Sequence, residues 1–152
     1  MVSRLLFAWC LMAVSVAIHA VGLTTAFRWV KRRRTLVDGR FWHVAWTMIC
    51  IAAWAILLHL LEIAAWACFY AWKGAMPDLA SALYFSAVTY TTTGYGDLLL
   101  APPWRLVGAV EALTGILMCG WSTGFFFAIV SRMYETSSPH GSESTVEPGP
   151  PP

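Results

Sequence analysis

Three long apolar runs dominate the sequence, and polar residues gather in the segments between them. The runs cover Leu5–Phe27, Val44–Trp72 and Trp104–Val130. At ~1.5 Å rise per residue the first run is about 34 Å long as a helix, enough to cross the ~30 Å hydrocarbon core of a bilayer. The pattern therefore predicts three transmembrane helices. The first run could instead be a cleaved signal peptide that starts at Arg4, but its length favours a span.

The composition agrees with a membrane protein. Hydrophobic residues make up 59% of the 152 residues and charged residues 12%, whereas a soluble domain carries roughly 25% charged residues. These values exclude a soluble monomer and disorder over most of the chain. A formal net charge of +2 gives no basis for binding nucleic acid. We expect the four cysteines to be buried small hydrophobic residues, because they lie in apolar runs without CxxC spacing: Cys10, Cys50, Cys68 and Cys119.

Basic residues mark one end of the first two runs. The connection between these runs holds Arg28, Lys31, Arg32, Arg33, Arg34 and Arg40. Only Lys73 and Arg105 flank the connection between the second and third runs. Because cytoplasmic loops carry more Lys and Arg, we expect the N-terminus to lie outside the membrane and the C-terminus in the cytoplasm. The end of the chain is rich in Ser, Pro, Gly and Glu, and we expect it to be disordered.

The connection between the second and third runs contains a short apolar segment, Pro77–Tyr90. Pro77 fixes φ and the carboxylate of Asp78 favours the positive end of a helix dipole, so both predict a helix start. As a helix this segment is about 21 Å long, which is too short to span a bilayer. A re-entrant half-helix fits, and the irregular backbone that follows it must then line a watery cavity.

The segment Thr91-Thr92-Thr93-Gly94-Tyr95-Gly96-Asp97 follows the half-helix. Glycine permits positive φ, so successive carbonyl groups can point toward one axis. A ring of such carbonyl groups can replace the water shell of a cation. The negative C-terminal end of the half-helix favours a cation at the same place. The segment therefore predicts a cation-binding site.

This segment closely resembles the selectivity filter of potassium channels, whose usual form is TVGYGD. Tyr84 and Phe85 are similar to the aromatic residues beside that filter, and Gly115 matches the region of the family's hinge glycine. From Val44 to Val130 the chain is similar to the helix–pore loop–helix module of the family. The whole chain resembles a small prokaryotic group that has the same Glu-Ala-Leu-Thr-Gly run in its last helix.

The resemblance implies an all-α membrane protein with a re-entrant pore helix and a selectivity filter between its second and third transmembrane helices. Residues 1–43 would form an extra helix and a basic cytoplasmic loop, residues 44–131 the pore domain, and residues 132–152 a disordered cytoplasmic tail. The resemblance also implies a homotetramer in the lipid bilayer, because one chain supplies one filter strand. Such a channel conducts K⁺ passively, with no catalytic activity and no cofactor besides the permeant K⁺.

The family's residue roles are expected at the matching positions of the segment. The carbonyl groups that bind K⁺ would come from Thr92, Thr93, Gly94 and Tyr95, with the Thr92 hydroxyl as the innermost ligand. Gly96 and Asp97 would shape the outer mouth, and Gly115 would be a hinge. Thr93 stands where valine is usual, and its hydroxyl could loosen the filter.

Three alternatives to a potassium-selective channel stay open. The first is a weakly selective monovalent cation channel, in which Thr93 relaxes the filter. The second is a metal-dependent membrane enzyme built on His59, Glu62 and Glu111, although no HExxH motif accompanies them. The third is a partner subunit that joins other channels and does not conduct alone.

Glu62 and Glu111 are ionisable residues inside apolar runs, where such groups are costly and indicate function. We expect them to brace the filter through hydrogen bonds to hydroxyl groups such as those of Ser81 or Ser86. A pH-sensing role is the second interpretation. A metal site is the third, because His59 and Glu62 share a helical face but two ligands are too few.

Overall fold

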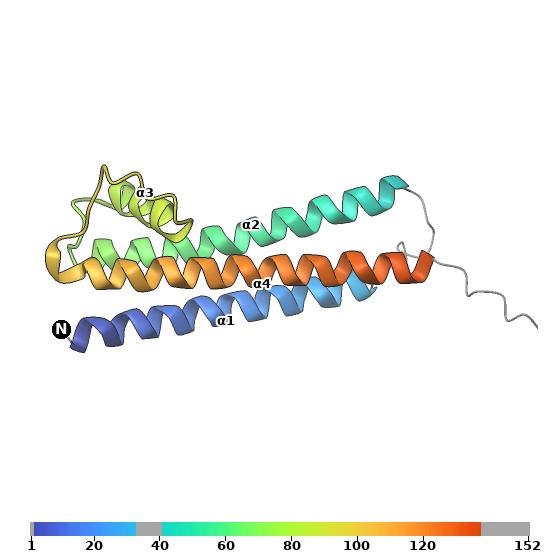
Figure 1. The fold of residues 1–152 in the computed structure, drawn as a ribbon, viewed down its shortest axis with the longest axis horizontal. Helices are drawn as coiled ribbons and strands as arrows, with labels where there is room; N and C mark the ends of the chain where they lie inside the picture. Colours follow the sequence, from blue (N-terminus) through green and yellow to red (C-terminus); the bar gives the residue numbers. More distant parts are fainter. Residues whose placement is uncertain (1, 33–40, 138–152) are drawn as a thin grey trace, which may run out of the picture.

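The protein is an all-α structure in the described residues, 2–32 and 41–137, of a computed structural model. The helices are α1 (Val2–Arg32), α2 (Phe41–Trp72), α3 (Leu79–Tyr90) and α4 (Arg105–Ser137), with a 3-10 turn, η2 (Pro102–Trp104), before α4. Three long helices lie side by side, and the short helix α3 folds back at the end that holds the start of α1 (Figure 1). The predicted all-α class with three helices able to span a membrane is confirmed, and the re-entrant character of the short helix stays a prediction.

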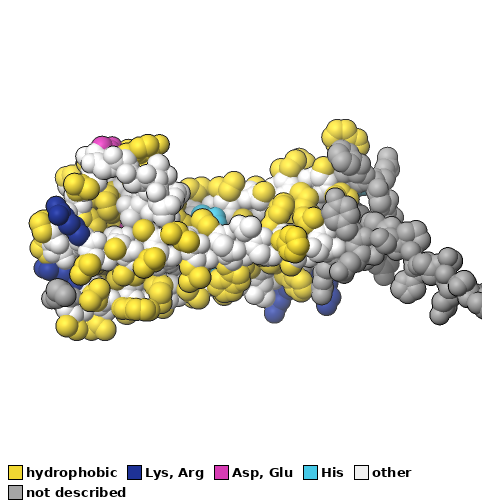
Figure 2. Space-filling view, viewed as in Figure 1, with side chains coloured by type: hydrophobic (Ala, Val, Ile, Leu, Met, Phe, Trp, Pro, Cys, Tyr) yellow, Lys and Arg dark blue, Asp and Glu magenta, His cyan; other side chains and the backbone are white. Residues whose placement is uncertain are grey.

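The three long helices α1, α2 and α4 are each long and apolar enough to cross a membrane. Hydrophobic side chains are spread along the whole described face in Figure 2, and Lys and Arg side chains appear toward its two ends. Compared with the predicted apolar runs, α1 is longer at both ends, α2 is longer at its start and α4 is longer at its end. Helix α4 runs to Ser137, so residues 132–137, predicted as the start of the tail, are helical.

Some sequence-based predictions fall on residues outside those that the structure describes. Arg33, Arg34 and Arg40 of the basic connection lie there, as do residues 138–152 of the predicted tail. The described basic residues Lys31 and Arg32 occupy the last turn of α1, where cations favour the negative end of the helix dipole.

Asp78 begins helix α3, as the sequence predicts. Its carboxylate accepts hydrogen bonds from the backbone N–H of Ser81 at 2.8 Å and from the Ser81 hydroxyl at 2.9 Å. These bonds satisfy donors that a helix start otherwise leaves unpaired, and they lower the pKa of Asp78. Because Ser81 is occupied by this cap, it does not serve as a partner for Glu62 or Glu111.

Aromatic side chains fill the core between α3 and the long helices. The rings of Tyr70 and Phe85 meet edge to face at 5.5 Å, and those of Phe69 and Trp104 meet at 5.8 Å. Trp66 is fully buried beside them. Lipid tails are as apolar as a leucine side chain, so the exclusion of water contributes little to the association of helices within a membrane. Van der Waals packing between side chains such as these holds the helices together. The α3 end of the bundle therefore holds the largest cluster of buried residues in the described chain.

The prediction that the cysteines are buried is wrong for most of them. Cys10, Cys68 and Cys119 are exposed and Cys50 is half-buried, and all are free thiols. Each lies in an apolar run as expected, but an apolar residue of a transmembrane helix can face lipid or another subunit as readily as its own bundle.

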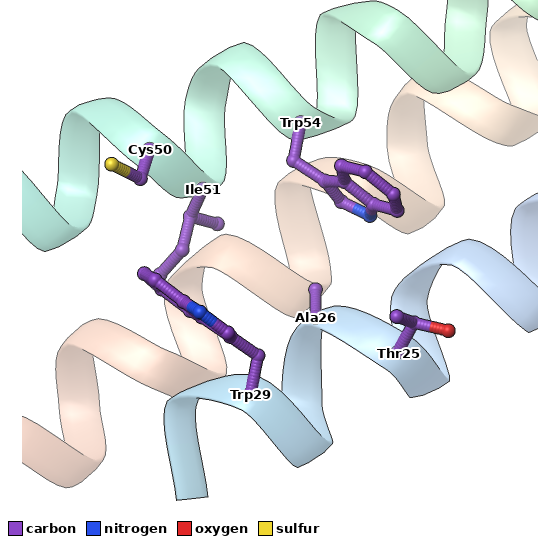
Figure 3. A pocket seen from close by; sticks show the side chains of 6 residues that line it. All are labelled: Thr25, Ala26, Trp29, Cys50, Ile51 and Trp54. Carbon is purple, nitrogen blue, oxygen red and sulfur yellow. The ribbon is translucent and has the colours of Figure 1, made fainter. Parts of the chain in front are cut away.

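A shallow apolar cavity of about 260 Å³ lies between α1 and α2 (Figure 3). Its lining residues are Thr25, Ala26, Trp29, Cys50, Ile51 and Trp54. The hydroxyl of Thr25 is bonded to Val21 O at 2.8 Å, and the indole N–H of Trp54 donates to Gly22 O at 3.0 Å. Its polar groups are thus used within the bundle, and the cavity is not part of the site described next.

Candidate functional site

The candidate filter segment, residues 91–97, leaves the C-terminal end of α3 through hydrogen bonds to the last turn of that helix. The backbone N–H groups of Thr91, Thr92 and Gly94 donate to Ala87 O, Thr89 O and Val88 O at 3.1, 2.9 and 3.0 Å. These three bonds use the amide groups of the segment and the terminal carbonyl groups of α3. They fix the start of the segment against the helix that precedes it.

Alternate residues of the candidate filter segment have positive φ. The values are 59° at Thr92, 52° at Gly94 and 77° at Gly96, whereas Thr93 and Tyr95 have negative φ. Such alternation lets successive carbonyl groups point to one side, which a regular strand does not allow. Thr92 carries a side chain in this conformation, at a cost on the order of 1 kcal/mol. Among the described residues, the carbonyl oxygens of residues 92–96 accept no hydrogen bond.

Asp97 ends the segment in a contact with α3. The hydroxyl of Tyr84 donates to Asp97 Oδ2 at 2.7 Å, and both side chains are exposed. This hydrogen bond stabilises the ionised form and is the main reason that the pKa of Asp97 is lowered. The carboxylate therefore stays negative to a lower pH than an isolated aspartate.

Replacing Tyr84 by phenylalanine should make this carboxylate titrate at higher pH. The pKa of Asp97 is lowered by the bond, so its loss raises that pKa toward the ordinary value. If the segment forms the predicted cation site with Asp97 at its outer mouth, cation current should fall at a higher pH in Tyr84→Phe than in the wild type. Currents across planar bilayers, acidified only on the side that bears Asp97, measure the shift. Superimposable pH profiles would contradict the assignment of Asp97 to the mouth.

Glu111 is fully buried behind α3 and joins three helices. The Tyr70 hydroxyl donates to Glu111 Oε2 at 2.7 Å, and Ser86 Oγ contacts Glu111 Oε1. Ser86 Oγ also donates to Ile63 O at 2.9 Å. One hydroxyl has a single hydrogen, so a protonated Glu111 that donates to Ser86 satisfies all three contacts. The structure thus places Glu111 against Ser86, one of the two expected partners, and its bracing role stays a prediction.

Glu62 is fully buried and contacts a different part of α3. Its two carboxyl oxygens meet His19 Nδ1, at 2.8 Å, and the hydroxyl of Tyr90. Tyr90 is the last residue of α3 and precedes the candidate filter segment. The partner of Glu62 is therefore a tyrosine at the end of the helix, and neither of the serines that the sequence suggested.

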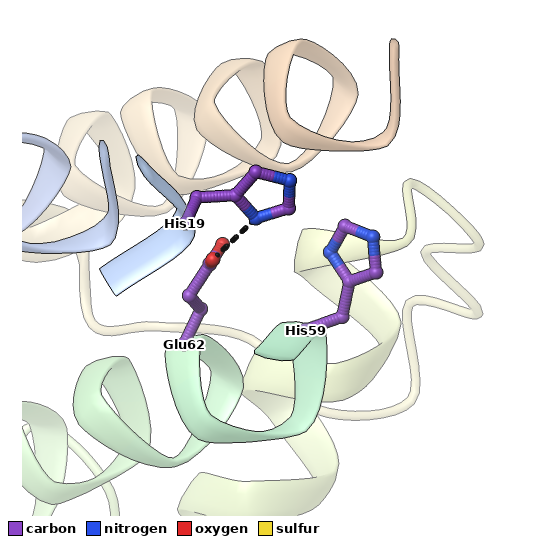
Figure 4. Close-up of side chains that lie close together, drawn as sticks. All are labelled: His19, His59 and Glu62. Carbon is purple, nitrogen blue, oxygen red and sulfur yellow. Dashed lines mark hydrogen bonds and ion pairs between the residues drawn. The ribbon is translucent and has the colours of Figure 1, made fainter. Parts of the chain in front are cut away.

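The predicted group His59, Glu62 and Glu111 is not assembled. Glu111 lies with Tyr70 and Ser86, whereas His59 and Glu62 meet His19 of α1 (Figure 4). The ligand atoms of His19, His59 and Glu62 lie within 4.8 Å of one another. The spacing of His59 and Glu62 predicts that they share one face of a helix. It does not reveal that His19, which lies on a different helix, is their neighbour.

Gly115 of α4 touches the end of α3. A Cβ atom at this position would lie 1.9 Å from Tyr90 O and 2.8 Å from Tyr90 C. Only glycine permits this approach, since neither partner atom belongs to a flexible side chain. The hinge role of Gly115 stays a prediction, and the structure gives this glycine a packing role that the sequence did not reveal.

Three long apolar helices, with a short helix and an irregular segment packed at one end, define an all-α integral membrane protein. A protein-family model described as "Ion channel" matches residues 46–132. The match covers more than half of the chain, which therefore belongs to this ion channel family. Neither the curated proteins nor the solved structures include a match to the chain. The family supports a channel and disfavours the enzyme alternative.

Proposed function

We propose that this ion channel is potassium-selective and conducts K⁺ passively through a homotetrameric pore. The observation that carries the proposal is the alternation of positive φ at Thr92, Gly94 and Gly96, with the carbonyl oxygens between them left free of hydrogen bonds in the described chain. Four such strands around one axis would offer stacked rings of oxygens in place of the water shell of the ion. Thr92, Thr93, Gly94 and Tyr95 would supply these oxygens, with Gly96 and Asp97 at the outer mouth.

The exposed apolar surface beside the candidate filter supports the homotetramer. Tyr95 is 71% exposed and Leu99 is 68% exposed in the single chain. On α4, Gly120 and Gly124 meet no atom of the described chain within 4 Å of where a Cβ would lie. Small residues allow close approach of helices from different chains. We propose that neighbouring subunits cover these surfaces and that α4 lines the pore.

The proposed location is a bacterial inner membrane, with the α3 end of the bundle facing outward. The basic residues Arg28, Lys31 and Arg32 lie at the opposite end of α1, and the positive-inside rule puts that end in the cytoplasm. Lys73 at the α3 end lies over the Trp72 ring, 3.6 Å from its centre, as expected of side chains at a membrane interface.

A weakly selective cation channel is the second candidate, and one contact bears on it. Thr93 Oγ1 and Thr91 Oγ1 lie 2.9 Å apart in a hydrogen bond within the segment. The Thr93 hydroxyl is thus held by a neighbouring side chain, in a place where valine could hold no such bond. This hydrogen bond has one of two effects on the segment. It either makes the segment more rigid, or it holds the pore at a width that also admits Na⁺. The ratio of K⁺ to Na⁺ permeability distinguishes the two effects.

Flux of K⁺ into liposomes that contain only this chain tests the proposal directly, and a bi-ionic reversal potential tests selectivity. We expect wild-type flux, a reversal potential that favours K⁺ over Na⁺, and in Thr93→Val a permeability ratio about threefold higher, equivalent to a net hydrogen bond of ~0.6 kcal/mol. A reversal potential near zero for the wild type would favour the weakly selective channel. Absence of flux would favour a subunit that needs other partners.

A further inference from the structure

Five side chains from four helices form a closed ring of hydrogen bonds, of which His59 and Ser122 are half-buried and the other three are buried. Glu62 Oε1 meets His19 Nδ1 at 2.8 Å, and His19 Nε2 meets Ser122 Oγ at 3.0 Å. Ser122 Oγ then meets His59 Nε2 at 3.2 Å, and His59 Nδ1 meets the Tyr90 hydroxyl at 3.0 Å. The Tyr90 hydroxyl closes the ring on Glu62 Oε2. The ring joins α1, α2, α3 and α4.

The number of protons that this ring can hold is fixed by its chemistry. Five contacts need five hydrogens, one for each contact. The hydroxyls of Tyr90 and Ser122 provide one each, each neutral imidazole provides one, and a single proton shared by Glu62 and His19 provides the last. Whether that shared proton resides on the carboxyl or on the imidazole, the ring as a whole carries no net charge. All five contacts are then satisfied by one hydrogen each, and with the shared proton on Glu62 every group donates to the next around the ring.

A sixth proton breaks this arrangement. Protonation of His59 makes both of its ring nitrogens hydrogen-bond donors. The Ser122 hydroxyl already accepts a hydrogen bond from His19, and it donates its own hydrogen to His59. Once His59 is protonated, that hydrogen has no acceptor. An unmatched polar contact inside an apolar bundle is costly. The other titratable groups that act on the ring are Cys119 and Glu111 of α4, both within electrostatic range of Tyr90. The ring is therefore complete only at one protonation state.

The ring lies directly behind the candidate filter segment. His19 and Glu62 are fully buried and Tyr90 is nearly so, with Ile63 and Met118 packed around the tyrosine. The hydroxyl of Tyr90 is held by the ring, while its carbonyl oxygen is in contact with Gly115. Since Thr91 follows directly, any displacement of Tyr90 moves the first residues of the segment. His19 is the member of the ring that comes from outside the family module matched at residues 46–132.

We propose that His19 of α1 is a positioning residue for the pore, which acts through Glu62 and Tyr90 to hold the filter in its conducting form, and that acidification releases this hold by adding a proton to the ring. The inference rests on the proposed function. It gives α1 a part in conduction, because the ring cannot close without that helix.

A metal ion is the competing occupant of the same cluster. His19, His59 and Glu62 could supply three ligand atoms, but in the structure each of those atoms already has a hydrogen-bond partner in the ring. Binding Zn²⁺ would require the ring to open and release protons. The complete set of matched contacts favours protons as the occupants.

The test compares K⁺ flux into liposomes, across a range of pH, for four variants and the wild type. His19→Leu and Ser122→Ala open the ring at different points, and Ser122→Ala does so by the loss of a single hydroxyl. Ser15→Ala is the matched control, because it removes the buried hydrogen bond from Trp66 Nε1 to Ser15 Oγ, 3.1 Å, which joins α1 to α2 outside the ring. We expect flux at neutral pH to fall about tenfold in both ring variants, as for loss of a buried hydrogen bond.

The pH profile separates positioning from simple packing. The wild type and Ser15→Ala should lose flux steeply on acidification, whereas both ring variants should show a flatter profile because their ring is already open. Asp97 is present in all of these proteins, so its own titration cancels in the comparison. His19→Asn, which keeps a donor near Nδ1 for Glu62, should recover part of the flux.

Two results would overturn the inference. The first is that Ser122→Ala and His19→Leu have the same flux and pH profile as Ser15→Ala, which would show that the ring does not position the filter. The second is one equivalent of transition metal in the purified wild-type protein, which would show that the cluster of His19, His59 and Glu62 is a metal site. Absence of flux from the wild type itself would instead contradict the proposed function, so the two failures are distinguishable.

Discussion

Replacing Gly94 by alanine should abolish K⁺ flux while it leaves the helices intact. Gly94 has a φ of 52°, a conformation that costs a residue with a Cβ atom ~1–2 kcal/mol. In a tetramer the cost is incurred four times around one axis, on the order of 4–8 kcal/mol in total. The segment relieves that strain by turning its carbonyl groups away, which removes the oxygens that the ion needs. Flux into liposomes should fall by about a hundredfold or more.

Gly74 supplies a matched control for this substitution. It has a φ of 60° and no atom within 4 Å of an added Cβ, as at Gly94, but it lies in the connection between α2 and α3. Gly74→Ala should therefore cause the same local backbone strain and leave flux within about twofold of the wild type. Equal loss of flux in both variants would contradict the assignment of the filter, because it would reflect strain alone.

Replacing Gly115 by alanine should destabilise the protein and stop conduction together. The new Cβ would lie 1.9 Å from Tyr90 O, and neither the carbonyl group nor the helix can rotate away as a side chain would. Overpacking of this kind costs ~1–3 kcal/mol and sometimes more. The helices must separate at the point where α3 passes into the candidate filter segment. Thermal unfolding in detergent and K⁺ flux should both show the loss.

Gly120 of the same helix is the control for Gly115. It has no atom of the described chain within 4 Å of an added Cβ, so Gly120→Ala causes no clash within its own subunit, and a loss of stability in this variant would reflect packing against the proposed neighbouring subunit. The comparison also separates the two roles of Gly115. A pure hinge predicts normal thermal stability with altered opening, whereas the contact with Tyr90 predicts reduced stability. Unchanged stability in Gly115→Ala would favour the hinge.

The sequence predicted the fold because the strongest signals are local. Apolar runs of sufficient length determine the three long helices, and Asp78 begins α3 because a carboxylate at that position satisfies the first N–H groups. The candidate filter segment was located by its own residues, since the positive φ of Gly94 and Gly96 is a property of glycine. Its role in K⁺ binding stays a prediction.

The candidate site was predicted less completely because most of its contacts join different helices. Spacing along α2 puts His59 and Glu62 on one face, but it does not reveal that His19 and Ser122 complete a ring with them. The same limit explains Gly115, whose neighbour Tyr90 lies on another helix. Hydropathy likewise does not distinguish a cysteine that faces lipid from one that faces the core, so Cys10, Cys68 and Cys119 were placed wrongly.

Because the ring is neutral in the protonation state inferred above, the transmembrane potential exerts no net force on it. A transmembrane potential does work of ~2.3 kcal/mol per elementary charge for each 100 mV, but only on charge that moves across the field. The ring has no net charge to move, and the described basic residues of α1 lie at its two ends, Arg4 at one and Arg28, Lys31 and Arg32 at the other. We therefore expect polarisation of the membrane to drive the permeant ions and to leave the helices in place, which a conductance–voltage curve without steep gating would show.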